Sequence, residues 1–184
     1  MGFAQRPNAV RALSVISFAE SSFFPIPPDV LLIPITLGRR EHWVRLSTIT
    51  TLASVIGGMF GYAIGYFLFT SIGQWIVTAY RAEDLFTAMG LKYEMYALIT
   101  VLTAAFTPIP YKIITISAGF FHISFLQFMI ASIVGRASRF FLVAWIVRRY
   151  GAAAEQFLDK NFNLLTLVFF ALLIGGFYVI FQVW

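Results

Sequence analysis

Long apolar stretches separated by short charged ones dominate the hydrophobic pattern of this 184-residue chain. A transmembrane helix needs about 20 consecutive apolar residues, and each stretch is long enough to supply them. The pattern therefore predicts an all-α polytopic membrane protein, with residues 1–184 forming a single integral membrane domain. The five stretches are residues 12–38, 46–72, 97–121, 125–147 and 162–184.

Two of the five stretches are interrupted by the same motif, Pro-Ile-Pro. Proline lacks a backbone donor and clashes with the preceding helical turn, so neither stretch can form one straight lipid-facing helix. An arm of about 10–12 residues rises roughly 15–18 Å, about half of a ~30 Å bilayer core. We therefore predict re-entrant helical hairpins over residues 12–38 and 97–121. Their structural tips are Pro25, Pro27 and Pro28 in the first hairpin, and Pro108 and Pro110 in the second.

The other three stretches contain no proline. Residues 46–72, 125–147 and 162–184 are therefore predicted to cross the membrane as continuous helices. Residues 73–96 carry charges of both signs and separate the two halves of the chain. This segment is predicted to form a loop or an interfacial helix.

Glycines recur at every fourth position of the first crossing helix, at Gly57, Gly61 and Gly65. This spacing places them on one helix face, and small residues allow a neighbouring backbone to approach closely. We expect another helix to pack there.

The distribution of basic residues supports the hairpins. A hairpin returns to the side it left, so a cytoplasmic N-terminus puts eight Lys and Arg residues inside and two outside, as the positive-inside rule expects. A full span over residues 12–38 would spoil this bias. The inside residues are Arg6, Arg11, Arg39, Arg40, Arg45, Arg148, Arg149 and Lys160, and the outside residues are Arg81 and Lys92.

The two hairpins are predicted to enter from opposite sides, each followed by a crossing helix, which makes an inverted repeat. Superposing the Pro-Ile-Pro motifs pairs Pro25 with Pro108 and Asp29 with Lys112. Inverted repeats with broken helices that meet near the midplane are a common way to build a transporter.

Five ionisable side chains lie within the apolar stretches. A charged residue at a helix centre costs about 2.5–3.5 kcal/mol, so such residues face the protein interior, pair with one another and mark functional pathways. A purely structural ion pair between Asp29 and Lys112 is the alternative explanation. The five residues are Glu20, Asp29, Lys112, Arg136 and Arg139.

The signs of these charges indicate the cargo. Lys112, Arg136 and Arg139 are predicted to bind an anionic substrate, and the two arginines share a helix face at i, i+3. Arginine matches phosphate with two parallel hydrogen bonds. A carboxyl group in a low-dielectric environment favours its neutral form, so we predict that Glu20 and Asp29 couple transport to protons.

Composition excludes several other classes of protein. The chain is 60% hydrophobic and 11% charged, against about 25% charged in soluble domains. Its formal charge is +5, but the basic residues flank apolar stretches, which favours anionic lipid over nucleic acid. There is no cysteine, and His42 and His122 are far apart, so no metal site or cofactor is expected. No catalytic motif is visible, and we expect no catalytic residue and no enzyme activity.

Short motifs follow one another over roughly residues 12–150. None is specific by itself, but their order and spacing together are distinctive. In chain order they are Phe18-Ala19-Glu20, Pro25-Ile26-Pro27-Pro28-Asp29, the helix from Gly57 to Gly65, Pro108-x-Pro110-Tyr111-Lys112 followed by Ala118-Gly119, and Gly135-Arg136-x-x-Arg139-Phe140.

This order resembles the DedA family, also called the SNARE-associated or VTT-domain proteins, and is most similar to its short branch with Pro-x-Pro-x-Lys in the second hairpin. The resemblance implies a multi-pass protein of a bacterial or archaeal plasma (inner) membrane. It also implies lipid transport, linked in bacteria to recycling of undecaprenyl phosphate and to the proton-motive force. Glu20, Asp29, Lys112 and Arg139 match the family's charged positions, while Arg136 is added from helical spacing.

We expect a transporter of the flippase or scramblase type that moves an anionic lipid of the polyprenyl-phosphate type, with proton coupling. The alternatives are a proton-coupled small-solute or ion antiporter, and a structural membrane assembly factor. The expected partners are membrane lipids, a lipid phosphate and protons, with no nucleic acid, and a homo-oligomer is compatible with each alternative.

Overall fold

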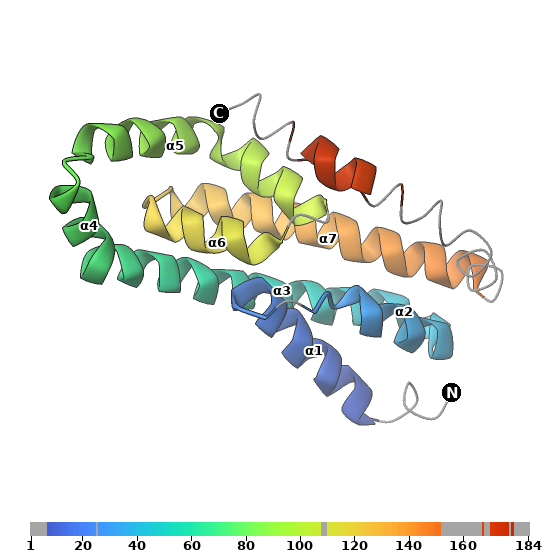
Figure 1. Ribbon diagram of the computed structural model, residues 1–184. Helices are drawn as coiled ribbons and strands as arrows, with labels where there is room; N and C mark the ends of the chain where they lie inside the picture. Colours follow the sequence, from blue (N-terminus) through green and yellow to red (C-terminus); the bar gives the residue numbers. More distant parts are fainter. Residues whose placement is uncertain are drawn as a thin grey trace.

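Helices connected by tight turns make up the computed structural model, which describes residues 7–24, 26–107, 110–151, 167, 170–176 and 178 (Figure 1). No strand occurs within these ranges. The elements are α1 (Pro7–Ser22), α2 (Asp29–Gly38), a 3-10 turn η1 (Arg40–His42), α3 (Trp43–Leu68), a π-helical segment η2 (Phe69–Gly73), α4 (Gln74–Ala79), α5 (Glu83–Phe106), α6 (Tyr111–Phe120) and α7 (Phe125–Tyr150).

The first predicted break lies where the prolines are. α1 ends at Ser22 and α2 begins at Asp29, because a residue before proline is disfavoured in the helical conformation. The chain doubles back there, so α2 runs toward the end of the molecule where α1 begins (Figure 1). The first arm begins at Pro7 rather than at residue 12.

The second break also occurs as predicted. α5 ends at Phe106, Thr107 is extended with ψ of 168°, and α6 begins at Tyr111 directly after Pro110. Pro25 and Pro108 lie outside the described residues. α6 runs back toward the end of the molecule where α5 starts, so the two hairpins come from opposite ends (Figure 1).

The first arm of the second hairpin is longer than predicted. The arm before the second break is not a half-length helix starting at residue 97, because α5 begins at Glu83 and bends about midway along its course (Figure 1). Residues 73–96 are helical apart from the turn at residues 80–82. The charges of this segment lie on the helix surface, a pattern that a sequence cannot separate from a loop.

Three described helices are long and apolar enough to cross a membrane: Arg40–Ala79, Glu83–Phe106 and Phe125–Tyr150. The first includes the predicted crossing helix 46–72, and the last includes 125–147. The predicted final crossing, 162–184, lies largely outside the described residues, although residues 170–176 are helical.

The helices pack in a pattern that repeats. α1 packs on α3 and α5 packs on α7, so the first arm of each hairpin lies against the long helix that follows it. The second arms cross over: α2 packs mainly on α7, and α6 mainly on α3. α3 and α7 contact each other between the two hairpins, and the hairpin tips therefore face each other in the middle of the molecule (Figure 1).

The predicted glycine face of α3 is confirmed. A Cβ atom added to Gly57 would overlap the carbonyl oxygen of Phe18 in α1, and one added to Gly65 would overlap that of Ile116 in α6. Gly61 lies against Thr115 of α6. The glycines thus let α3 contact both hairpins at backbone distance.

Buried apolar side chains form two clusters, one in each half of the molecule. The first joins α5, α6 and α7 around Tyr93, Tyr111 and Phe128, and the second joins α1, α2, α3 and α7 around Leu13 and Phe140. Much of the outer surface is also apolar, with large side chains such as Trp75 and Leu126 exposed. Such a surface suits a lipid environment.

Candidate functional site

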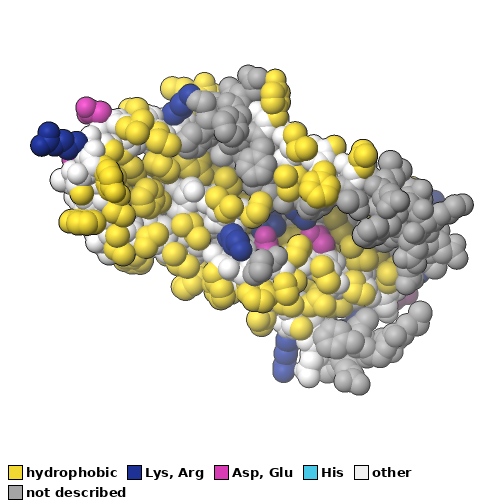
Figure 2. Space-filling view, in the orientation of Figure 1, with side chains coloured by type: hydrophobic (Ala, Val, Ile, Leu, Met, Phe, Trp, Pro, Cys, Tyr) yellow, Lys and Arg dark blue, Asp and Glu magenta, His cyan; other side chains and the backbone are white. Residues whose placement is uncertain are grey.

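Two arginines of α7 lie where the tips of the hairpins meet. Arg136 and Arg139 are three residues apart, so they project from the same side of the helix. α7 packs against α2, α3 and α5, which brings both arginines within reach of the two breaks. In Figure 2 acidic and basic side chains gather at the centre of a face that is otherwise mostly hydrophobic.

Arg136 binds the end of α1. Its Nη2 atom donates hydrogen bonds to Glu20 Oε2 at 2.6 Å and to Ser21 Oγ at 3.1 Å. The guanidinium lies 4.0 Å from the centre of the Tyr111 ring, a cation–π contact with the second hairpin. The side chain of Arg136 is 1% exposed and that of Glu20 is 14% exposed. This ion pair is therefore buried and tied to both hairpins.

Arg139 links the two breaks directly. Its Nη2 atom donates to Asp29 Oδ2 at 2.6 Å, and its Nη1 atom donates to the carbonyl oxygen of Thr107 at 2.9 Å. Asp29 is in the first turn of α2, where the helix dipole also stabilises a carboxylate. Thr107 is the residue that ends α5. The Arg139 side chain thus hydrogen-bonds to a group at the start of α2 and to a group directly after the end of α5.

No direct ion pair between Asp29 and Lys112 occurs among the described residues. Asp29 forms its ion pair with Arg139 of α7 instead. Lys112 is in the first turn of α6 and half-buried, and its ammonium group has no hydrogen bond or ion pair to any residue that the structure describes. Arg136 and Arg139 therefore each pair with one of the two carboxylates, and Lys112 is left without a partner among the described residues.

Buried polar atoms with no partner show that the site can form further hydrogen bonds, with Asp29 Oδ1 as an acceptor and Arg136 Nε as a donor. Asp29 Oδ1 and Arg136 Nε are both buried and make no hydrogen bond within the described chain. An unpaired buried polar atom is costly, and such atoms mark positions where a further group can bind.

Hydroxyl groups complete the site, and the sequence analysis assigned them no such role. Ser21 Oγ lies 2.7 Å from Ser54 Oγ of α3 and 3.1 Å from Glu20 Oε2. Thr115 donates to the Ser21 carbonyl oxygen at 3.2 Å, and Tyr111 donates to Ser132 of α7. Tyr111 directly precedes Lys112 in the Pro-x-Pro-Tyr-Lys motif. This position next to a charged residue is the one sequence signal that points to a role for Tyr111 in the site.

The described tip prolines differ in burial. Pro27 and Pro110 are exposed, whereas Pro28 is buried directly before Asp29. Beside Arg139, an open cleft of about 400 Å³ lies between α5 and α7. Its lining is mainly apolar, with hydroxyl groups at one edge: Leu102, Thr103, Phe106, Thr107, Val134, Gly135 and Ser138.

The described residues contain no group of three or more His, Cys, Asp or Glu side chains that could hold a metal ion. The chemistry of the site rests on charge, hydrogen bonding and the apolar cleft.

Helices of crossing length, exposed apolar side chains and a charged buried centre define an integral membrane protein. This chain belongs to the VTT domain family, the domain of the DedA proteins, whose family model matches residues 26–149. That match confirms the resemblance seen in the motifs, and the family points to a membrane transporter-like role.

Relatives occur in bacteria and in an archaeon. The chain is 36% identical over 169 residues to an uncharacterized protein of Haemophilus influenzae, covering 90% of this chain and 85% of the relative. It is 33% identical over 163 residues to an uncharacterized protein of Histophilus somni, covering 86% and 85%. It is 28% identical over 126 residues to an uncharacterized protein of Methanocaldococcus jannaschii, covering 68% and 75%. No solved structure is significantly similar.

Proposed function

We propose that this protein moves an anionic lipid of the polyprenyl-phosphate type across the bilayer, as a flippase or scramblase, with proton coupling. The observation that carries this proposal is the set of charges at the facing breaks: two partly buried ion pairs, and Lys112 in the first turn of α6 without a partner among the described residues. Such a site has the charge and the hydrogen-bond donors for a phosphate group.

In this proposal the two hairpins are re-entrant, and their tips meet near the middle of the membrane. Irregular backbone at this depth is tolerated only where protein or a polar cavity covers it. The tips here are covered by α7 and joined through Arg139. The N-terminus is cytoplasmic, as the bias of basic residues predicts, and the membrane is the bacterial or archaeal plasma membrane.

The phosphate would bind Lys112 first and then compete with Asp29 for Arg139. A carboxylate that loses its arginine in a low-dielectric site binds a proton more readily. In this proposal the carboxylates that exchange protons are Asp29, whose Oδ1 atom has no hydrogen-bond partner among the described residues, and Glu20. Cargo binding and proton binding are thereby linked.

The apolar cleft beside Arg139 favours a lipid over a small solute. It is open and lies between α5 and α7, with Phe106 and Leu102 in its lining. A long-tailed lipid needs a side opening of this kind for its chain, whereas a solute carrier needs a water-filled vestibule closed to lipid. The small-solute or ion antiporter is therefore the weaker alternative.

The completed ion pairs favour a second candidate, a structural membrane assembly factor. Glu20–Arg136 and Asp29–Arg139 both join α7 to the first hairpin at 2.6 Å. Removal of one partner of a buried pair destabilises a protein whatever its function. This candidate predicts a stable protein that transports no lipid.

The test is transport in proteoliposomes that contain purified protein and a polyprenyl phosphate, with and without a pH gradient. We expect transport that responds to the gradient, and we expect Lys112→Gln to reduce it about tenfold or more, since a hydrogen bond to a charged group contributes about 1.5–3 kcal/mol. The matched control is Lys92→Gln, which removes an exposed lysine of α5.

Equal transport by Lys112→Gln and Lys92→Gln would remove Lys112 from the cargo site. An intact protein that moves no polyprenyl phosphate under any gradient would support the structural candidate. Gradient-driven movement of small ions without lipid would support the antiporter.

A further inference from the structure

A second polar region lies away from the central ion pairs, at the end of the molecule where α1 begins. A pocket of about 270 Å³ opens there between α1, α3 and the turn that joins α2 to α3. Its polar lining is entirely basic or neutral: Arg11, Arg39, Arg45 and His42. Its apolar lining is Val10, Leu46 and Ile49.

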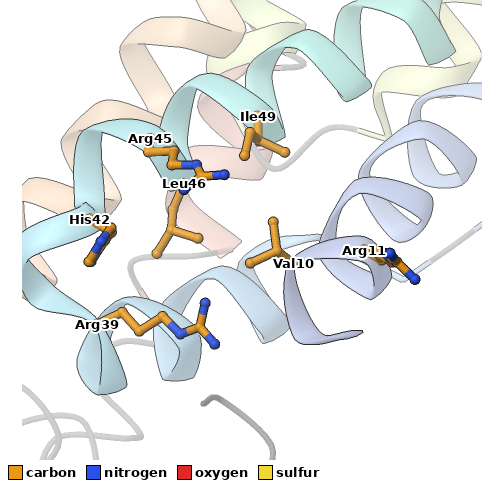
Figure 3. A pocket seen from close by; sticks show the side chains of 7 residues that line it. All are labelled: Val10, Arg11, Arg39, His42, Arg45, Leu46 and Ile49. Atoms are coloured by element: carbon orange, nitrogen blue, oxygen red, sulfur yellow. The ribbon is translucent and has the colours of Figure 1, made fainter. Parts of the chain in front are cut away.

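The arrangement of these side chains suits an amphipathic ligand. In Figure 3 Arg39 and Arg45 extend from opposite sides toward the space between them, and Val10 and Leu46 point into it. Arg11 and His42 stand at its two ends. A phosphate group would lie between the guanidinium groups, and the apolar part of the same molecule would contact Val10 and Leu46.

Among the residues that the structure describes, no acidic side chain lines this pocket. The nearest carboxylate in sequence is Glu41, which is exposed and not part of the lining. Arg39 also interacts with another group. Binding of a phosphate group requires only that the Arg39 guanidinium reach the pocket. Arg11 and Arg45 are exposed. The pocket therefore presents concentrated positive charge over an apolar floor.

The same end of the molecule carries further basic residues. Arg148 of α7 lies over the Trp43 ring at 5.4 Å, and a Cβ atom added to Gly151 would meet the side chain of Arg40. Basic residues at a membrane boundary are attracted by the negative surface potential of anionic lipids, each by about 1 kcal/mol. This general attraction concentrates anionic lipid near the pocket but does not itself make a binding site.

We propose that this pocket binds the phosphate headgroup of an anionic membrane lipid, with the lipid's apolar part resting on Val10 and Leu46. The site is distinct from the central ion pairs and does not require that the protein transport anything. The basic side chains suit the phosphate ester of a lipid headgroup, and the apolar floor favours a lipid over free phosphate.

Binding is measured with the purified full-length chain in neutral detergent. Native mass spectrometry follows the binding of short-chain phosphatidylglycerol, with phosphatidylcholine as the neutral reference and inorganic phosphate as a competitor. The variant is Arg39→Gln with Arg45→Gln. The matched control is Arg148→Gln with Arg149→Gln, which removes the same charge from the same end without touching the lining.

We expect the Arg39/Arg45 variant to bind phosphatidylglycerol about a hundredfold more weakly, roughly tenfold for each arginine, because a hydrogen bond to a charged group contributes about 1.5–3 kcal/mol. The Arg148/Arg149 control should stay within about a factor of two of the unmodified protein, because neutral detergent presents no anionic surface for general attraction. Millimolar inorganic phosphate should not displace the lipid. If the double variant unfolds, Arg45→Gln alone carries the test, with a loss of about tenfold.

Equal weakening by both double variants would reduce the pocket to general charge attraction and overturn the proposal. Displacement of the lipid by inorganic phosphate at similar concentration would make it a free-anion site instead. Because binding is measured without transport, failure of the proposed transport in proteoliposomes leaves this result unaffected, and the reverse also holds.

Discussion

Arg139 is the residue on which the centre of this protein depends. Its two hydrogen bonds reach Asp29, which begins α2, and Thr107, which directly follows α5. The carbonyl oxygen of Thr107 lies at the proline break, so the guanidinium satisfies a backbone group there and also neutralises the carboxylate of Asp29. It is also 21% exposed and lies beside the cleft that adjoins Thr107. A single side chain therefore joins the two breaks and is still partly exposed.

Replacing Arg139 tests whether it binds cargo. Arg139→Gln should lower lipid-phosphate transport about ten- to hundredfold, since a hydrogen bond to a charged group contributes roughly 1.5–3 kcal/mol. Arg139→Lys should keep part of the activity, because the charge remains and the planar fork does not. The measurement is transport in proteoliposomes, with thermal unfolding as the check on folding.

The matched control is the double variant Asp29→Asn with Arg139→Gln. The single variant leaves Asp29 as an uncompensated carboxylate, and the double variant removes that penalty. We expect the double variant to recover stability and not transport. Recovery of transport together with stability would mean that Arg139 is only structural.

The five charged residues of the centre could be predicted from the sequence, but the partners could not. Ionisable groups in apolar stretches are unusual enough to be found one by one. Superposing the two motifs paired Asp29 with Lys112, whereas Asp29 contacts Arg139. The pairing depends on where α7 passes relative to both tips, and that is a property of tertiary packing that no local pattern carries.

At the scale of helices, the closest packing is between α3 and α6. Gly65 of α3 lies against the backbone of Ile116 and Phe120, and Gly119 of α6 lies against the backbone of Tyr62 and Tyr66. The two glycines thus remove side chains from both sides of one interface. Helices in lipid associate through such contacts, because the hydrophobic effect does not favour helix association there.

Gly119→Ala should destabilise the protein by about 1–3 kcal/mol, the usual cost of an added methyl group in a tight interface. The methyl group would overlap the carbonyl oxygen of Tyr62, and backbone cannot move aside as a flexible side chain would. Thermal unfolding in detergent measures the loss.

Gly90→Ala is the control for the alanine substitution. A Cβ atom at Gly90 of α5 meets Phe121 only at 3.9 Å, an ordinary contact distance. Alanine also favours a helix over glycine by up to about 1 kcal/mol, so this variant should be as stable as the unmodified protein or more so. An unchanged unfolding temperature for Gly119→Ala would show that α3 and α6 can separate without loss.

Both breaks occur where the sequence places a Pro-Ile-Pro motif, because closely spaced prolines disrupt a helix for reasons local to the backbone. The single Pro34 is accommodated within α2. The start of α5 at Glu83 was not found, because charged residues on one side of a helix and charged residues in a loop give the same local composition. Only the packing of α5 on α7 distinguishes the helix from a loop.

The whole molecule is two similar halves that exchange arms. Each first arm packs on its own long helix, and each second arm packs on the long helix of the other half. Each second arm therefore makes its largest contact with the other half of the molecule. The Pro-Ile-Pro motifs mark the corresponding position in the two halves.

The last prediction concerns how this molecule lies in the membrane. Arg11 and Arg39 line one pocket and Arg40 follows directly, so both ends of the first hairpin are at the same end of the molecule.

If that hairpin is re-entrant, cysteines introduced as Arg11→Cys and Arg40→Cys should both react with an impermeant thiol reagent from the cytoplasmic face. The natural chain has no cysteine, so the background is free of other thiols. Lys92→Cys, exposed on α5, should react only from the opposite face. Labelling of positions 11 and 40 from opposite faces would make residues 12–38 a full span and end the inverted-repeat topology, whatever the packing of the helices.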